Sequence, residues 1–159
     1  PLQSPDNNCF RINSPYTDDE YFVVEYRKKE GMYEVGTPGY DSGLLVFRIN
    51  TVVGNGNADG PPDEVYVYRY SGTPLSNGDI SRAPFNQSSG RVEFNDSTNP
   101  SCFLTDTGPG GINIRDVGYA GNTIQFMYQT LSLYAEITNI TDEGDGDGLR
   151  RSRHRRQEA

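Results

Sequence analysis

The chain holds few side chains of the kinds that break bonds. Its single histidine, His154, lies in a run of arginines near the C-terminal end. A Ser-His or Cys-His mechanism needs a histidine base beside its nucleophile, and a zinc-peptidase helix needs two histidines four residues apart. The sequence therefore argues against both. A carboxylate pair such as Glu25 and Glu64 is conceivable for glycosidase-type work, but acidic pairs on β proteins more often lie on the surface or bind calcium.

The stretch EYFVVEYR, residues 20–27, carries charges at alternate positions. In a strand, Glu25 and Arg27 share one face, and Val24 and Tyr26 share the other. The next apolar run contains Arg48, so we expect an opposite-charge ladder between two strands, worth a few tenths to about 1 kcal/mol per pair. On this interpretation the charges order a sheet and catalyse nothing.

Calcium binding is the sharpest chemical hypothesis. The loop NGNADGPPDE, residues 55–64, combines Gly and Pro with oxygen-bearing side chains. Calcium takes six to eight oxygen ligands, which side chains and carbonyls of such a loop can supply. The alternative is an ordinary loop of Asx turns. The candidate ligands are Asn55, Asn57, Asp59, Asp63 and Glu64.

The two cysteines, Cys9 and Cys102, are too few for a four-ligand zinc site. In a secreted protein we expect them to form a disulfide, which would close a long loop and attach the N-terminal arm to a late turn. The alternative is two unrelated thiols, one of them buried.

Aromatic residues alternate in VYVYRY, residues 65–70. Tyr66, Tyr68 and Tyr70 lie on one face of the predicted strand. That face is either buried in a core or exposed as an aromatic platform for a carbohydrate.

Composition favours a β domain rich in loops. The apolar fraction is 33%, with 18 Gly, 10 Pro and 11 Tyr, and no long segment repeats apolar residues at helical spacing. No run approaches the roughly 20 apolar residues of a membrane helix. The opening PLQSPDNNCF lacks the pattern of a signal peptide, so we expect an excised or mature segment.

Alternation and turn chemistry predict an antiparallel β-sandwich-like module over residues 1–138. The expected strands, including a hairpin with its turn at AGN, cover residues 20–27, 44–50, 65–70, 91–94, 112–128 and 131–137. Residues 139–159 form an acidic Gly/Asp linker followed by an Arg-rich tail, which we expect to be disordered. Glu143, Asp145 and Asp147 resemble the start of a calcium loop, but its twelfth position is His154.

Charge is distributed unevenly along the chain. The last ten residues hold five Arg and one Glu, a net charge of +4, so the remaining 149 carry −12 of the total of −8. A body this acidic repels phosphate, which argues against nucleic acid as a partner.

Four segments in order resemble one known family: DEYFVVEYRKKEG, GYDSGLLVFRIN, PPDEVYVYRYSGT and FNDSTNPSCFLTDTGPGGINIRDVGYAGNTIQFMY. Together they cover most of the chain, from Asp19 to Tyr128. They resemble the region after the catalytic core of immune-inhibitor-A-like secreted zinc metallopeptidases. There a strand of the type EYFLIENR precedes one of the type GLLIWHVD. This chain has Arg48 and Asn50 in place of the His and Asp, which removes a metal ligand at that His.

The resemblance implies an extracellular, non-catalytic β module that supports the peptidase catalytic domain of the same polypeptide. It leaves open whether the module also takes part in substrate recognition. It also implies stabilisation by calcium. The family's HExxH helix precedes this region and is absent from this chain, so the resemblance assigns no catalytic or zinc-binding residue here, and we expect no proteolysis from this chain alone. The alternative is a free-standing extracellular adhesion or carbohydrate-binding domain that contacts a protein or glycan through Tyr66, Tyr68 and Tyr70.

Overall fold

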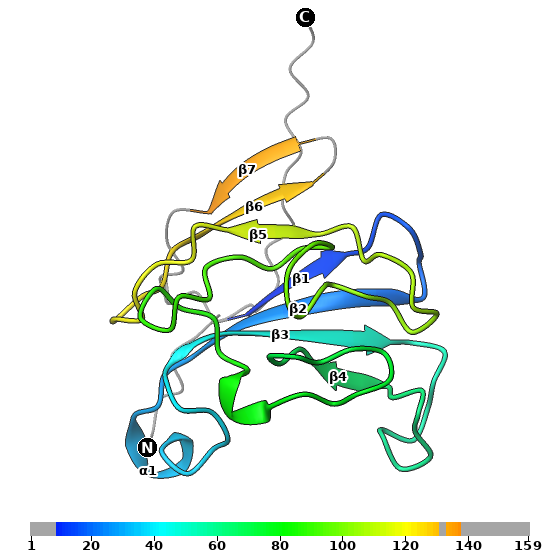
Figure 1. Cartoon of the computed structure of the whole chain (residues 1–159), viewed down its shortest axis with the longest axis horizontal. Helices are drawn as coiled ribbons and strands as arrows, with labels where there is room; N and C mark the ends of the chain where they lie inside the picture. The colour runs from blue at the N-terminus through cyan, green and yellow to red at the C-terminus, as the bar shows by residue number, and fades with distance from the viewer. Residues whose placement is uncertain (1–8, 131–132, 138–159) are drawn as a thin grey trace, which may run out of the picture.

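The chain folds as an all-β protein built from two antiparallel sheets, as the sequence predicts (Figure 1). The structure is a computed structural model that describes residues 9–130 and 133–137. The first sheet contains, in spatial order, β1 (Cys9–Asn13), β2 (Glu20–Arg27), β3 (Gly43–Asn50) and β4 (Val65–Val67). The second contains β5 (Asn113–Arg115), β6 (Phe126–Thr130) and β7 (Leu133–Ile137). The short helical turns are α1 (Gly31–Glu34) and η1 (Ile80–Arg82).

Burial alternates along β2 because successive side chains of a strand point to opposite faces. Phe22 and Val24 are completely buried, whereas their neighbours Tyr21, Val23 and Glu25 are only partly buried. The register pairs Phe22 with Arg48 and Val24 with Val46. One face of the first sheet therefore faces the core. We call the opposite face, which carries Tyr21 and Val23, the outer face.

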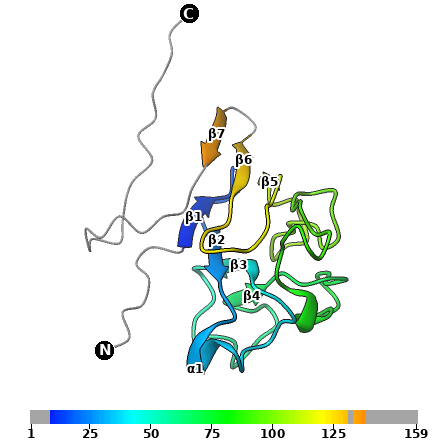
Figure 2. The same ribbon diagram turned by 90° about the vertical axis from the view of Figure 1, so that its left-hand side faces the viewer.

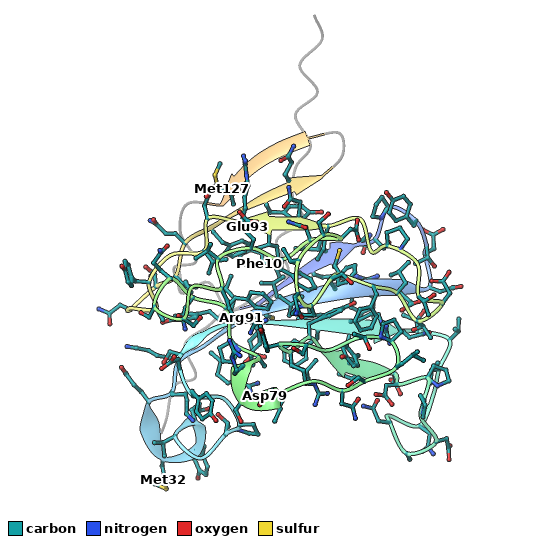
Figure 3. The ribbon with its side chains drawn as sticks, in the orientation of Figure 1. Phe10, Met32, Asp79, Arg91, Glu93 and Met127 are labelled. Atoms are coloured by element: carbon teal, nitrogen blue, oxygen red, sulfur yellow. The ribbon has the colours of Figure 1, made fainter. Side chains whose placement is uncertain are left out.

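The layer opposite the core face is formed by the β5–β6 hairpin and by the long irregular segment 68–112. Figure 2 shows this segment, in green, on one side of the first sheet. Two isolated bridges, Leu44 to Phe85 and Phe94 to Ile114, connect it to β3 and β5. Phe10 of β1 meets Phe126 of β6 edge-to-face at 6.4 Å. In Figure 3 Phe10 lies between the sheets, whereas Met32 of α1 lies at the outside of the molecule.

Most predicted strands are present, with altered ends. Residues 20–27 form β2 as predicted, and β3 begins one residue before the predicted 44–50. Residues 65–70 form a strand only to Val67, because the chain turns at Ser71, whose φ is 58°. Residues 91–94 contribute only isolated bridges. The sequence analysis did not predict β1, whose signal is the short alternation of Phe10 and Ile12.

The predicted disulfide is absent, because Cys9 and Cys102 are both unpaired. Cys9 is exposed and pairs in register with Glu25, so it lies on the outer face of the sheet. Cys102 is fully buried in the core on the other side. Its Sγ lies 2.9 Å from the carboxylate Oδ1 of Asp96. The sheet itself therefore separates the two sulfur atoms.

The predicted linker and tail, with Glu143, Asp145, Asp147 and His154, lie outside the described residues. Within the described residues, no helix has the length and apolar character needed to cross a bilayer.

Candidate functional site

A pocket with both polar and apolar lining lies at the end of the first sheet where β2 begins and β3 ends. Figure 1 shows this end of the two strands at the right. The cavity has a volume of about 410 Å³ and lies between the loop that precedes β2 and the loop around Thr105. Its polar and aromatic lining comes from Tyr16, Thr17, Asp19, Glu20, Asn50, Thr105 and Asp106.

Glu20, on the floor of the pocket, forms a buried ion pair with Arg48 behind it. A carboxylate oxygen of Glu20 lies 3.0 Å from Nε of Arg48, and the two side chains are only 8% and 5% exposed. Glu20 also accepts hydrogen bonds from the backbone N–H of Thr105 at 3.1 Å and from its hydroxyl at 2.7 Å. Such a pair tolerates burial only when further hydrogen bonds satisfy the charged atoms. The floor is thus held in one arrangement by β2, β3 and the Thr105 loop.

Asn50 extends this network. Its Nδ2 donates to the hydroxyl of Thr105 at 3.0 Å, and its Oδ1 accepts from the backbone N–H of Val52 at 3.0 Å. Thr105 can therefore accept from Asn50 and donate to Glu20 at the same time. The strand register explains the meeting, because Glu20 and Asn50 are paired residues at the ends of β2 and β3.

The backbone carbonyl of Phe103 belongs to the same hydrogen-bond network. It accepts a hydrogen bond from Nη1 of Arg48 at 3.4 Å and another from the hydroxyl of Tyr68. Burial raises the pKa of Tyr68 well above its usual value. The network therefore links the core to the pocket floor.

The predicted ladder between Glu25 and Arg48 is wrong. Arg48 faces the core, whereas Glu25 lies on the outer face and pairs at 3.0 Å with Arg27 of its own strand. The suggested carboxylate pair is not a unit either, because Glu25 pairs with Leu45 near the start of β3, whereas the carbonyl of Glu64 accepts from the N–H of Asn50 at its end.

The rim of the pocket is held by contacts between two loops. Ser14 donates from its hydroxyl to the carbonyl of Gly110 at 3.0 Å and accepts from the N–H of Tyr16 at 3.2 Å. The Tyr16 ring rests on Gly111, where an added Cβ would lie 2.6 Å from the Cε2 atom of the ring. Gly111 also has a φ of 73°, which disfavours any other residue. Tyr16 is 54% exposed, so it is fixed in position while presenting ring surface to solvent.

The predicted calcium ligands lie in a loop whose side chains bond to one another and to the backbone. Asn55 donates to Oδ2 of Asp59 at 2.9 Å. Asn57 accepts from the N–H of Val65 at 2.9 Å and donates to its carbonyl at 2.7 Å. These bonds agree with the Asx-turn alternative. Among the described residues, no three His, Cys, Asp or Glu side chains are grouped so that they could hold a metal ion.

The prediction of an exposed aromatic platform is wrong, because two of its three tyrosines are buried. Tyr66 is 5% exposed and Tyr68 is completely buried. Their ring centroids lie 5.2 Å apart, and Tyr68 packs 4.7 Å from Phe94. Tyr70 is half-buried, with the guanidinium of Arg82 3.6 Å above its ring. Tyr66 and Tyr68 thus form core, which confirms the alternative of a buried face.

The sequence analysis missed Tyr16, Glu20, Asn50 and Thr105 as a group. Two of them carried a usable signal: when 20–27 and 43–50 pair as antiparallel neighbours, Glu20 and Asn50 must meet. Thr105 and Tyr16 carried none, since both lie in irregular segments and reach the site through tertiary contacts.

The described residues place no histidine beside a nucleophile in the pocket. The resemblance to the immune-inhibitor-A-like peptidases rests on the four sequence segments given above alone. No protein-family model matches the chain, and no curated protein or solved structure matches it.

Proposed function

We propose that this chain is a non-catalytic β module of a secreted zinc metallopeptidase. It supports the catalytic domain of the same polypeptide and contributes to substrate recognition. The four family-like segments support the proposal, and two of them contain β2 and β3, which form the centre of the first sheet.

The outer face of the first sheet is the observation that carries the proposal. Cross-strand partners place apolar side chains in two rows on this face: Tyr21, Ile49 and Val65, then Val23, Phe47 and Val67. All six are partly exposed, Val65 the most at 37%. An antiparallel sheet with one face in water normally alternates apolar and polar residues. A contiguous apolar surface of this kind is typical of an interaction site.

The catalytic domain of the same polypeptide is the occupant that fits this face. In the described part of the chain, the strands of this sheet contact chiefly one another. The chain as a whole is acidic, but this face carries few charges and no excess of acidic ones. Glu25 is paired with Arg27, and the guanidinium of Arg11 lies 3.8 Å over the ring of Tyr21. An apolar surface with an acidic rim would therefore complement it. Covalent linkage also raises the effective concentration, so a modest contact area suffices.

The test compares this chain alone with the polypeptide that includes its upstream segment. The proposal requires an HExxH helix in that segment and no casein cleavage by this chain with zinc supplied. The double variant Val23→Thr, Val67→Thr should change the stability of the isolated chain by about 1 kcal/mol or less. In the longer polypeptide it should lower the unfolding temperature clearly.

The control is Val52→Thr, which alters a residue 69% exposed and outside the sheet. Equal effects of the double variant in both polypeptides would contradict docking at the outer face. Cleavage of casein by the isolated chain would contradict the non-catalytic role.

A free-standing extracellular adhesion or carbohydrate-binding domain is the second candidate. Its proposed platform of Tyr66, Tyr68 and Tyr70 is largely buried. The observation that favours this candidate is instead the exposed Tyr16 ring beside the polar pocket.

A further inference from the structure

We infer that the Tyr16 pocket binds a carbohydrate that is neutral or carries an amino group, and that it rejects anionic sugars. The inference does not depend on a peptidase domain, because it uses only residues of this pocket.

The first argument is the position of Tyr16. Sugar rings have an apolar C–H face that packs against an aromatic ring, and such a ring must be exposed yet held in place. Tyr16 is 54% exposed. Gly111 supports the edge of its ring, and the bond from its N–H to Ser14 fixes its backbone. Little side-chain freedom is therefore lost when a ligand packs on it.

The second argument is the surplus of hydrogen-bond acceptors. The carboxylate of Asp19 has no hydrogen bond or ion pair among the described residues, and Asp106 uses only Oδ1, for the N–H of Gly108 at 2.8 Å. The floor groups Glu20 and Asn50 are already satisfied by Arg48, Thr105 and Val52. These exposed acceptors at the rim suit a ligand that donates hydrogen bonds, as sugar hydroxyl groups do.

The third argument is charge. Asp19 and Asp106 are both acidic, and the nearby Arg48 is neutralised by Glu20. A carboxylate, sulfate or phosphate group would thus face two negative charges without a compensating cation. Uronic acids, sulfated glycans and phosphosugars are excluded by this repulsion.

The fourth argument separates a sugar from a bare cation. Val52, Leu104 and Pro109 also line the cavity, and a hydrated ion makes no use of apolar walls. A sugar uses both kinds of lining, through its C–H face and its hydroxyl groups. The cavity of about 410 Å³ lies in the usual size range of small-ligand sites.

The test uses the full chain on an array of neutral, amino and anionic glycans, followed by titration calorimetry with the strongest hit. Binding should be confined to neutral and amino sugars. Tyr16→Ala should weaken it by up to about tenfold, since aromatic stacking adds up to about that factor. Tyr16→Phe keeps the ring and should bind within about threefold of the unaltered chain.

Asp106→Asn keeps the acceptor for Gly108 but removes the charge, and it should relax the rejection of uronic acids. The matched control is Tyr40→Ala, which removes a tyrosine that is 73% exposed and does not line the pocket. It should leave binding unchanged.

Three results would overturn the inference. They are no glycan bound at millimolar concentration, binding unchanged by Tyr16→Ala, and a preference for anionic sugars. Binding of calcium or of a lysine-rich peptide in place of glycans would also overturn it. None of these results bears on docking at the outer face, which the domain experiment tests separately.

Discussion

Glu20 and Arg48 form an ion pair at 3.0 Å that joins the first residue of β2 to the interior of β3. Their side chains are 8% and 5% exposed, so water has little access to either charge. The hydroxyl and N–H of Thr105 complete the arrangement. The pair connects the core to the pocket, and several properties of the protein depend on it.

Loss of one partner should be costly. Glu20→Gln leaves the Arg48 guanidinium buried without a counter-charge, and we expect the free energy of unfolding to fall by about 3–5 kcal/mol. The double variant Glu20→Gln, Arg48→Met should lose much less than the sum of the two single variants. Urea unfolding measures all three. A loss below about 1 kcal/mol for Glu20→Gln would show that the pair is accessible to solvent.

The two thiols should differ sharply in reactivity. Burial, followed by the contact with Asp96, raises the pKa of Cys102 to about 12, so little thiolate forms at pH 8. Cys9 is exposed. A disulfide-exchange reagent at pH 8 should label one thiol rapidly in the folded protein and two after denaturation. Cys9→Ser should abolish the rapid phase. A denatured, unreduced sample without free thiols would contradict the unpaired cysteines.

Buried tyrosines should make the protein sensitive to alkali. Burial is the main cause that raises the pKa of Tyr26, Tyr66, Tyr68 and Tyr128, the last to about 12. A raised folded pKa gives stability that is present below the unfolded value, near 10, and is lost as pH rises through the folded value. The free energy of unfolding should therefore fall from about pH 10 upward.

Arg91 acts in the opposite direction. Burial lowers its pKa to about 10, so the folded state releases this proton before the unfolded state does, and stability from this group rises above pH 10. Four tyrosines have raised pKa values and one arginine has a lowered value, so we expect the net stability to fall above pH 10. Ultraviolet titration and urea unfolding at several pH values measure the balance, with Tyr68→Phe expected to flatten the decline. Tyr40→Phe, at an exposed position, serves as control. Stability that stays constant up to pH 12 would contradict the prediction.

Calcium in the 55–64 loop remains a hypothesis with a direct test. A bound ion stabilises the folded state, so a chelator should lower the unfolding temperature if Asp59 and Glu64 are ligands. Asp59→Asn should abolish the difference between calcium and chelator. Asp79→Asn, which alters an acidic residue at the start of η1, should preserve it. An unchanged midpoint in the unaltered chain would remove calcium from this loop.

The parts of the fold that were predictable are those with a repeating pattern. β2 and β3 were found because each is a short apolar run that carries charges and is bounded by turn residues. The 68–112 segment has little regular pattern beyond the alternation at residues 68–70 and 91–94, and its place in the core could not be predicted. Phe85 and Phe103 gave no such signal, although they fill the core. The disulfide prediction failed because cysteine number and spacing do not reveal the face on which each residue lies.

The candidate site was less predictable than the fold. Side-chain chemistry directed attention to the charges of Glu25 and Arg48, but only the register shows that these lie on opposite faces. The pocket depends on the contact of Tyr16 with Gly111, between positions 95 residues apart. The alternation of residues along a single strand does not reveal contacts between positions so far apart in the sequence.

The bond from Ser14 to Gly110 also bears on how the protein reaches its native state. The first loop of the module closes against residues near its end, and the floor likewise needs Thr105. Contacts of such long sequence separation slow folding, because most of the chain must be gathered before they form. A nascent chain cannot fold this end of the molecule until residue 111 has left the ribosome. A chain truncated before residue 111 should remain sensitive to proteolysis.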